Sequence, residues 1–138
     1  MRSRHHLGFA QSLLNLGNKQ EERGAKETVA RLEKLTEGHP ESAEIALEFA
    51  KGLYNLSYKQ EERGAKETVA RLEKLTGEHP ESAEITVVFA AGLLILSSKQ
   101  EEKETLETVT RLEKLAGEHP DIPKIMEIFK MAKDSDAR

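Results

Sequence analysis

The feature of this sequence that most restricts its fold is a forty-residue repeat. The segments that open at Gln20, Gln60 and Gln100 read QEERGAKETVARLEKLTEGHPESAEI, QEERGAKETVARLEKLTGEHPESAEI and QEEKETLETVTRLEKLAGEHPDIPKI. The forty residues from Gln20 differ from those from Gln60 at nine positions, and an earlier partial copy, residues 7–19, aligns with 47–59 and 87–99. Such copies are expected to stack one supersecondary unit repeatedly along one direction.

Each unit contains two stretches of apolar residues at helical spacing. The first holds Ile45, Ala46, Phe49, Ala50, Leu53 and Leu56, and the second holds Ala65, Val69, Leu72 and Leu75. Charged residues make up 33% of the chain and aromatic residues 4%, a composition typical of helical proteins covered by solvent. We therefore predict an all-α protein built from helical hairpins.

Proline and glycine mark the expected limits of these helices. Pro40 and Pro80 suit a first helical turn, so the first helix of a unit is expected to start near residues 41 and 81. Gly24 and Gly64 can adopt the left-handed conformation that ends a helix, so the hairpin turns are expected near 20–24 and 60–64. Glu104 replaces this glycine in the last copy, so the third turn could be built differently.

The C-terminal segment predicts one further helix. Asp121 is expected to be its N-cap and Pro123 to lie in its first turn. One side carries Ile122, Ile125, Met126, Phe129 and Ala132. We expect this helix, about 121–133, to cap the last repeat, within a single repeat domain over 1–138 with hairpins at about 7–39, 41–79 and 81–119.

The helical pairs resemble the tetratricopeptide repeat. The resemblance is carried by Leu16 and Gly17 in the first helix, Gly24 at the turn and Pro40 after the second helix. It covers nearly the whole chain, although the period is forty residues where that family's is about thirty-four. The resemblance implies a right-handed α-solenoid of three hairpins and a capping helix, with a concave groove that holds peptides.

Seven of the nine differences between the two closest copies fall in residues 46–58. Five of them change polarity or size, and their spacing places them on one helical face: Glu48/Val88, Lys51/Ala91, Tyr54/Leu94, Asn55/Ile95 and Tyr58/Ser98. The apolar pairs are unchanged, among them Phe49/Phe89 and Leu53/Leu93. The sequence thus predicts one face that is kept for packing and another that varies.

The tetratricopeptide resemblance implies that the varying face lines the groove. The expected groove residues are Gln11, Leu14, Asn15, Asn18, Lys51, Tyr54, Asn55, Tyr58, Val88, Ala91, Leu94 and Ile95. We expect anchoring of a partner peptide by Tyr54, Tyr58 and Ile95 and hydrogen bonds to its backbone from Asn15, Asn18 and Asn55. A carboxylate clamp of the kind found in one subclass is not expected, because Leu14, Ala91 and Ile95 stand where basic residues would be needed.

Three other interpretations of the varying face remain open. The apolar face of residues 87–98 could pair with a second copy of the chain, giving a homodimer or a structural homo-oligomerising module. Alternatively, Val88, Ala91 and Ile95 could be buried against the capping helix or against Leu106, which replaces Lys66. The near-identity of two copies would also suit a consensus-like engineered repeat.

Composition excludes several classes of partner. The net charge of −4 arises from 21 basic and 25 acidic residues that are interleaved, so no basic block favours nucleic acid. There is no cysteine, and no apolar run approaches the ~20 residues of a membrane span. We expect a soluble, cytoplasmic protein that binds another protein or a peptide.

No pattern in the sequence indicates catalysis. His39, His79 and His119 recur once per unit, but stacked repeats lie about 10 Å apart and Zn–N bonds are ~2 Å, so the three cannot share a metal ion. No nucleophile–base constellation or phosphate-binding loop is found. We expect no catalytic residues, no metal and no cofactor, and we interpret the chain as a noncatalytic interaction scaffold.

Overall fold

The computed structural model describes residues 22–136, which form six α-helices and no strand. The helices are α2 (Glu22–Gly38), α3 (Ala43–Lys59), α4 (Glu62–Glu78), α5 (Ala83–Lys99), α6 (Glu102–Glu118) and α7 (Pro123–Asp136). The start of α5 lies forty residues after that of α3, and the start of α6 lies forty residues after that of α4. The all-helical repeat predicted from the sequence is therefore confirmed over this range.

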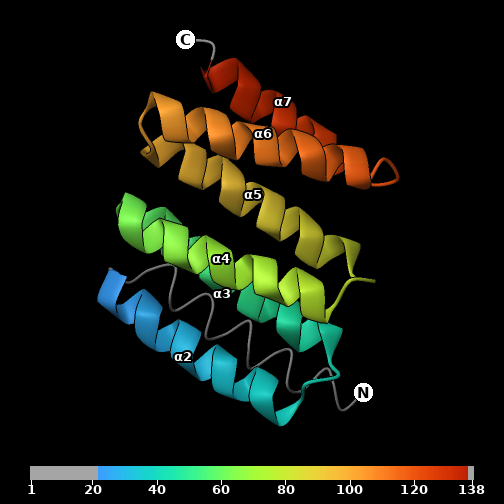
Figure 1. Ribbon diagram of the computed structural model, residues 1–138. Coiled ribbons are helices and arrows are strands. Elements are labelled where there is room, and N and C mark those ends of the chain that lie inside the picture. The colour runs from blue at the N-terminus through green and yellow to red at the C-terminus, as the bar shows by residue number, and fades with distance from the viewer. Residues whose placement is uncertain (1–21, 137–138) are drawn as a thin grey trace.

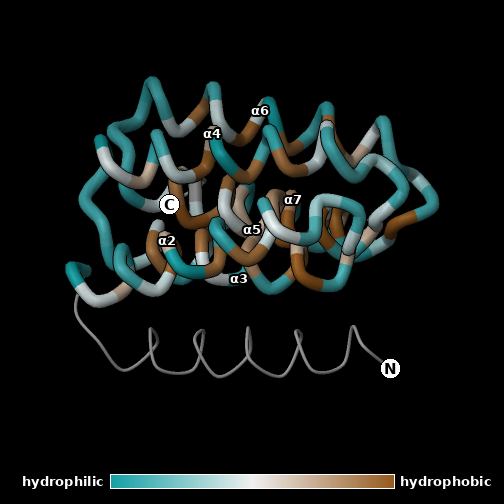
Figure 2. Tube along the Cα trace, turned by 90° about the horizontal axis from the view of Figure 1, so that it is seen from below, coloured by the Kyte–Doolittle hydropathy of each residue, from teal (hydrophilic) through white to brown (hydrophobic). Residues whose placement is uncertain are grey.

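The helices form two layers (Figures 1 and 2). Helices α2, α4 and α6 lie in one layer and α3, α5 and α7 in the other, with the apolar residues gathered between the layers. Within the second layer, α5 packs directly against both α3 and α7. In the first layer no Cα atoms of α2, α4 and α6 come within 8 Å of one another. The helices of the second layer are therefore joined to one another by direct packing, whereas those of the first layer are not.

Long charged side chains bridge the first layer. Arg71 on α4 lies 3.3 Å from Glu33 on α2, and Arg111 on α6 lies 3.5 Å from Glu73 on α4. The two ion pairs occupy equivalent positions in successive units, and all four side chains are partly exposed. They form a ladder of exposed charges along the α2–α4–α6 layer.

Serine residues cap the N-termini of α3 and α5. Ser42 and Ser82 are the N-caps of α3 and α5, and each hydroxyl accepts a hydrogen bond of 3.2 Å from the N–H three residues on. The preceding Pro40 and Pro80 lie outside the helices, in turns closed by bonds from Ser42 to His39 and from Ser82 to His79. The expected placement of these prolines in a first helical turn was wrong, because the serine cap sets the start of the helix.

The hairpin turns do not use a left-handed glycine. Gln60 and Gln100 end α3 and α5 in extended conformation, with φ of −89° and −92°, and no glycine within 22–136 has a positive φ. The predicted helix-ending role of Gly24 and Gly64 is therefore wrong, since both lie inside helices. Because Gln100 adopts the same conformation as Gln60, the third turn matches the second although Glu104 replaces Gly64.

The side chains of Gln60 and Gln100 link each turn to the following helix by a hydrogen bond. Thr68 on α4 donates a hydrogen bond to the buried side-chain amide oxygen of Gln60, and Thr108 on α6 donates one to Gln100. A Cβ atom at Gly64 would lie 3.0 Å from the Gln60 amide nitrogen. The Gln60 side chain thus lies close to Gly64, but it does not require a glycine, because Glu104 stands at the equivalent position beside the same Gln100–Thr108 bond.

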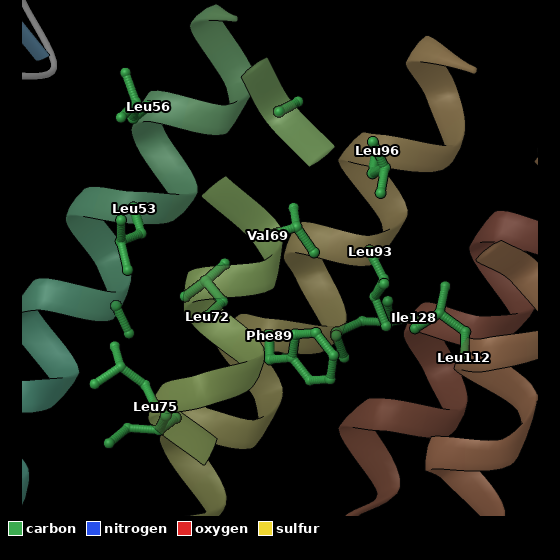
Figure 3. Packing of buried hydrophobic residues seen from close by; sticks show 14 of the residues in the cluster. Leu53, Leu56, Val69, Leu72, Leu75, Phe89, Leu93, Leu96, Leu112 and Ile128 are labelled. Atoms are coloured by element: carbon green, nitrogen blue, oxygen red, sulfur yellow. The ribbon is translucent and has the colours of Figure 1, made fainter. Parts of the chain in front are cut away.

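The core contains the apolar residues that the periodicity selected (Figure 3). Side chains from neighbouring helices meet between the layers, among them Leu53, Leu72, Phe89, Leu93, Leu112 and Ile128. The α2–α3 and α4–α5 contacts are close, since a Cβ atom at Gly52 or Gly92 would lie 2.8 Å from Leu32 or Leu72. Close approach of this kind requires a residue without a side chain.

The last helix differs in detail from the expectation. It spans 123–136 rather than 121–133, with Pro123 as its first residue, so Asp121 lies in the preceding turn and is not the N-cap. Its buried residues are Ile125, Ile128 and Ala132, whereas Met126, expected on the buried side, is 41% exposed. Within 22–136, no helix has the length and apolar character needed to cross a membrane.

Candidate functional site

Four of the seven positions that differ between α3 and α5 lie along a surface that we call the outer face. Its described members are Lys51, Tyr54, Asn55 and Tyr58 on α3 and Ala91, Leu94, Ile95 and Ser98 on α5. All are partly or fully exposed, and Tyr58 is the most exposed large apolar side chain at 63%. Gln11, Leu14, Asn15 and Asn18, also predicted for the groove, lie outside the described residues.

Helix α5 forms the centre of the outer face. It contacts α3, α4, α6 and α7, which leaves one side of the helix without a neighbour among the described helices. That side carries Val87, Ala91, Leu94 and Ile95, each half-buried. A helix that is apolar around its whole circumference is normally buried on every side. The open side of α5 is therefore an apolar surface that no described helix covers.

Val88 lies at a position that packs between helices elsewhere in the array. In α7, which contacts only α5 and α6, the buried residues Ile125 and Ile128 stand at the positions of Ile85 and Val88. Glu48, at the same position in α3, is only 2% exposed, whereas Val88 itself is half-buried and packs partly against the core. The expectation of a freely exposed varying position is therefore wrong for Glu48.

The buried Glu48 carboxylate has a nearby cation. Lys51 approaches it to 3.4 Å within α3, and the Lys51 side chain is 44% exposed while that of Glu48 is 2% exposed. A buried acid needs such a partner, because an unpaired charge in an apolar environment is costly. Lys51 therefore has a structural role in addition to its place on the outer face.

Tyr58 is held by a residue that the sequence analysis did not select. The Lys99 ammonium group on α5 donates a 2.9 Å hydrogen bond to the Tyr58 carbonyl and lies 5.9 Å from the centre of the tyrosine ring. Lys99 thus joins the ends of α3 and α5 beside the outer face. The sequence shows that a lysine recurs at positions 59 and 99, but it does not show that Lys99 bonds to Tyr58, forty-one residues earlier.

The alternative that the apolar face is simply core is supported in part. Leu106 is 58% exposed and so is not buried against this face, but the capping helix α7 does pack against α5. Val87, Val88, Ala91 and Leu94 do pack partly against the core. The face is thus half core and half surface, which is the composition of a contact area that a partner could complete.

The described residues contain no group of three histidine, cysteine or carboxylate side chains that could hold a metal ion. His39 and His79 nevertheless line one pocket, which the sequence analysis did not anticipate because it treated each histidine as an isolated loop residue.

Comparison of the chain with protein-family models, with curated proteins and with solved structures finds no significant match.

Proposed function

We propose that this chain is a noncatalytic scaffold of tetratricopeptide-repeat type, a right-handed solenoid that binds a peptide or helix of a protein partner on its outer face. The observation that carries the proposal is the pattern of differences between α3 and α5. Phe49/Phe89 and Leu53/Leu93 are unchanged and buried, whereas Tyr54/Leu94 and Asn55/Ile95 differ and are partly exposed. Most positions that pack are kept, with Ala46/Thr86 and Glu48/Val88 as the exceptions, while the partly exposed positions have changed.

The outer face supplies the groups that peptide recognition requires. Tyr54 and Tyr58 offer rigid aromatic area with a polar hydroxyl, and Ile95 offers apolar area on the adjacent helix. Asn55 can bond the backbone of an extended segment or the side chains of a helical one. The partner is expected to be apolar where it crosses α5 and more polar where it crosses α3.

The decisive variant gives α5 the outer residues of α3, with Ala91→Lys, Leu94→Tyr and Ile95→Asn. All three positions are partly exposed, and α3 carries the introduced residues at its equivalent positions, so the change should alter the outer face while the fold is kept. Val88→Glu is left out, because the acid at the equivalent position 48 is buried. Leu106→Lys is the matched control, since it also restores an earlier copy's residue, Lys66, at an exposed apolar position on another helix.

The experiment compares three immobilised forms of the protein: wild type, triple variant and control. A partner captured from cell lysate by the wild type and by Leu106→Lys, but not by the triple variant, is the expected result. Circular dichroism should show equal helicity in all three forms. Capture of the same partner by a folded triple variant would overturn the proposal.

A second candidate function is self-association through residues 87–98. The apolar open side of α5 favours it, because an isologous dimer would cover this side with its own copy. Light scattering coupled to size-exclusion chromatography separates the two functions. A wild-type dimer that becomes a folded monomer in the triple variant would assign the face to self-association, and a monomer in both forms would leave it to another protein.

A further inference from the structure

A separate pocket lies on the other layer of the molecule, between the C-terminal halves of α2 and α4 and over the start of α3. We call it the edge pocket, and its volume is about 460 Å³. Pockets of roughly 300–1,000 Å³ are those that hold small ligands or single side chains of a partner. The edge pocket shares no residue with the outer face, so its function can be tested independently of the one proposed above.

The floor of the edge pocket is apolar. Ala46 and Phe49 of α3 and Leu75 of α4 line it. A ligand that enters the pocket therefore needs an apolar part that can lie on these side chains. A small inorganic ion has no such part.

The charged groups at the edge pocket leave an excess of negative charge. The positive charge of Arg71 is matched by Glu33 at 3.3 Å, and the guanidinium also lies over the Phe49 ring. Glu37 and Glu78 form no ion pair within the described part of the chain, and Lys74 is the one cation lining the pocket that is left to balance them. The balance, two carboxylates against one ammonium group, is negative.

The helix ends add to this potential. Both α2 and α4 terminate beside the pocket, and neither carries a basic residue in its last turn. Helix C-termini bear a partial negative charge of roughly half an electron, which basic residues usually offset. Glu37 and Glu78 stand in these last turns instead. Two helix ends and two acids thus favour a cation, and they outweigh Lys74.

A buried polar group also faces this pocket. The His79 side chain is 10% exposed, and its Nδ1 lies 3.8 Å from a carboxylate oxygen of Glu81, too far for a hydrogen bond. Glu81 is thus the charged neighbour of this ring among the described residues. Because His79 lines the edge pocket, a ring nitrogen can accept a hydrogen bond from a ligand there.

We infer that the edge pocket binds an arginine side chain of a partner peptide. The methylene stem of arginine would lie on Ala46 and Leu75, beside the Phe49 ring that Arg71 already covers on one side, and the guanidinium would bind the carboxylates of Glu37 and Glu78. Its planar set of five donors can reach acceptors on two helices at once, which the ammonium group of lysine does less well. A spare N–H can donate to the His79 ring.

The test is a titration of ¹⁵N-labelled protein with N-acetyl-arginine amide, followed by two-dimensional NMR. Parallel titrations use N-acetyl-lysine amide and inorganic phosphate. The expected result is a saturable shift of backbone amides near Glu37, Glu78 and His79, with arginine amide binding more tightly than lysine amide. Phosphate should leave these amides unchanged.

The paired variant Glu37→Gln with Glu78→Gln should weaken the binding of arginine amide about fivefold, the effect of removing two exposed charge partners. Both glutamates are exposed, so the variant should fold normally. Glu127→Gln on α7 is the matched control and should bind like the wild type. Equal binding by all three forms, absence of a saturable shift, or shifts produced by phosphate instead of arginine would each overturn the inference.

Discussion

Arg71 on α4 contacts two other helices at once. Its guanidinium lies 3.3 Å from the Glu33 carboxylate on α2 and 5.7 Å from the centre of the Phe49 ring on α3. Arg111 repeats the ion pair with Glu73 at 3.5 Å, and no contact with the equivalent ring, Phe89, is found in the described structure. Arg71 and Arg111 occupy equivalent positions in successive repeats, but Arg71 makes two of these contacts and Arg111 makes one.

We predict that Arg71→Ala lowers the free energy of unfolding by about 1 kcal/mol, because it removes an exposed ion pair and a cation–π contact. Arg111→Ala, the matched control, should cost less than half as much. Chemical denaturation of both variants measures the difference. Equal losses would show that the Phe49 contact contributes nothing.

Replacing helical glycines by alanine should change the stability of the protein in opposite directions at Gly52 and Gly77. Gly52→Ala is expected to cost about 1–3 kcal/mol, because the new methyl group would lie 2.8 Å from Leu32 and force α2 and α3 apart. Gly77→Ala on α4 has nothing within 4 Å and should stabilise the protein by up to about 1 kcal/mol. Thermal unfolding gives both signs, and a neutral Gly52→Ala would contradict the packing described for these helices.

The hydrogen bond from Thr68 to Gln60 should be one of the costlier polar contacts to remove. Both side chains are buried, so Thr68→Val leaves the glutamine oxygen without its donor at a cost of about 1–3 kcal/mol. The control is Thr76→Val, which removes an exposed bond to the Glu73 carbonyl and should change stability by less than about 0.5 kcal/mol. Denaturant titration compares the two, and equal effects would exclude a special role for the turn.

The serine caps offer a test of where the first helices begin. Ser82→Ala should lower the free energy of unfolding by about 1 kcal/mol, because it leaves the Ile85 N–H without an acceptor. Ser98→Ala, an exposed serine near the end of α5, should have little effect. Amide hydrogen exchange at the start of α5 should accelerate only in the first variant. Unchanged exchange there would mean that the cap is not needed.

The regular part of the fold could be predicted because the repeat and the helical periodicity are independent signals that agree. Phe49, Leu53 and their equivalents were assigned to the core by spacing, and they are buried. Spacing alone could not predict the burial of Glu48, since α3 contacts α5 in its own layer as well as α2 and α4 in the other. Which of its polar positions is enclosed depends on those neighbours.

The glycine and histidine interpretations failed for a related reason. Gly64 was interpreted from its own backbone preferences, whereas in the structure it lies inside α4, has no positive φ and approaches the side chain of Gln60. His39 and His79 were considered one at a time, and their common pocket exists only because α2 and α4 lie in the same layer. The unbalanced acids at residues 37 and 78 were the signal in the sequence that could have indicated this pocket.

The two layers will respond differently to bending. Helices α3, α5 and α7 are joined by packed apolar side chains, whereas α2, α4 and α6 are linked across their layer by the pairs Arg71–Glu33 and Arg111–Glu73. Among the described helices, no direct backbone packing within the first layer opposes a spread of α2, α4 and α6, and about 1 M salt screens the exposed pairs within ~3 Å. We therefore expect the α2–α4–α6 side of the array to be the more easily bent one, and to bend more easily as the ionic strength of the solution rises.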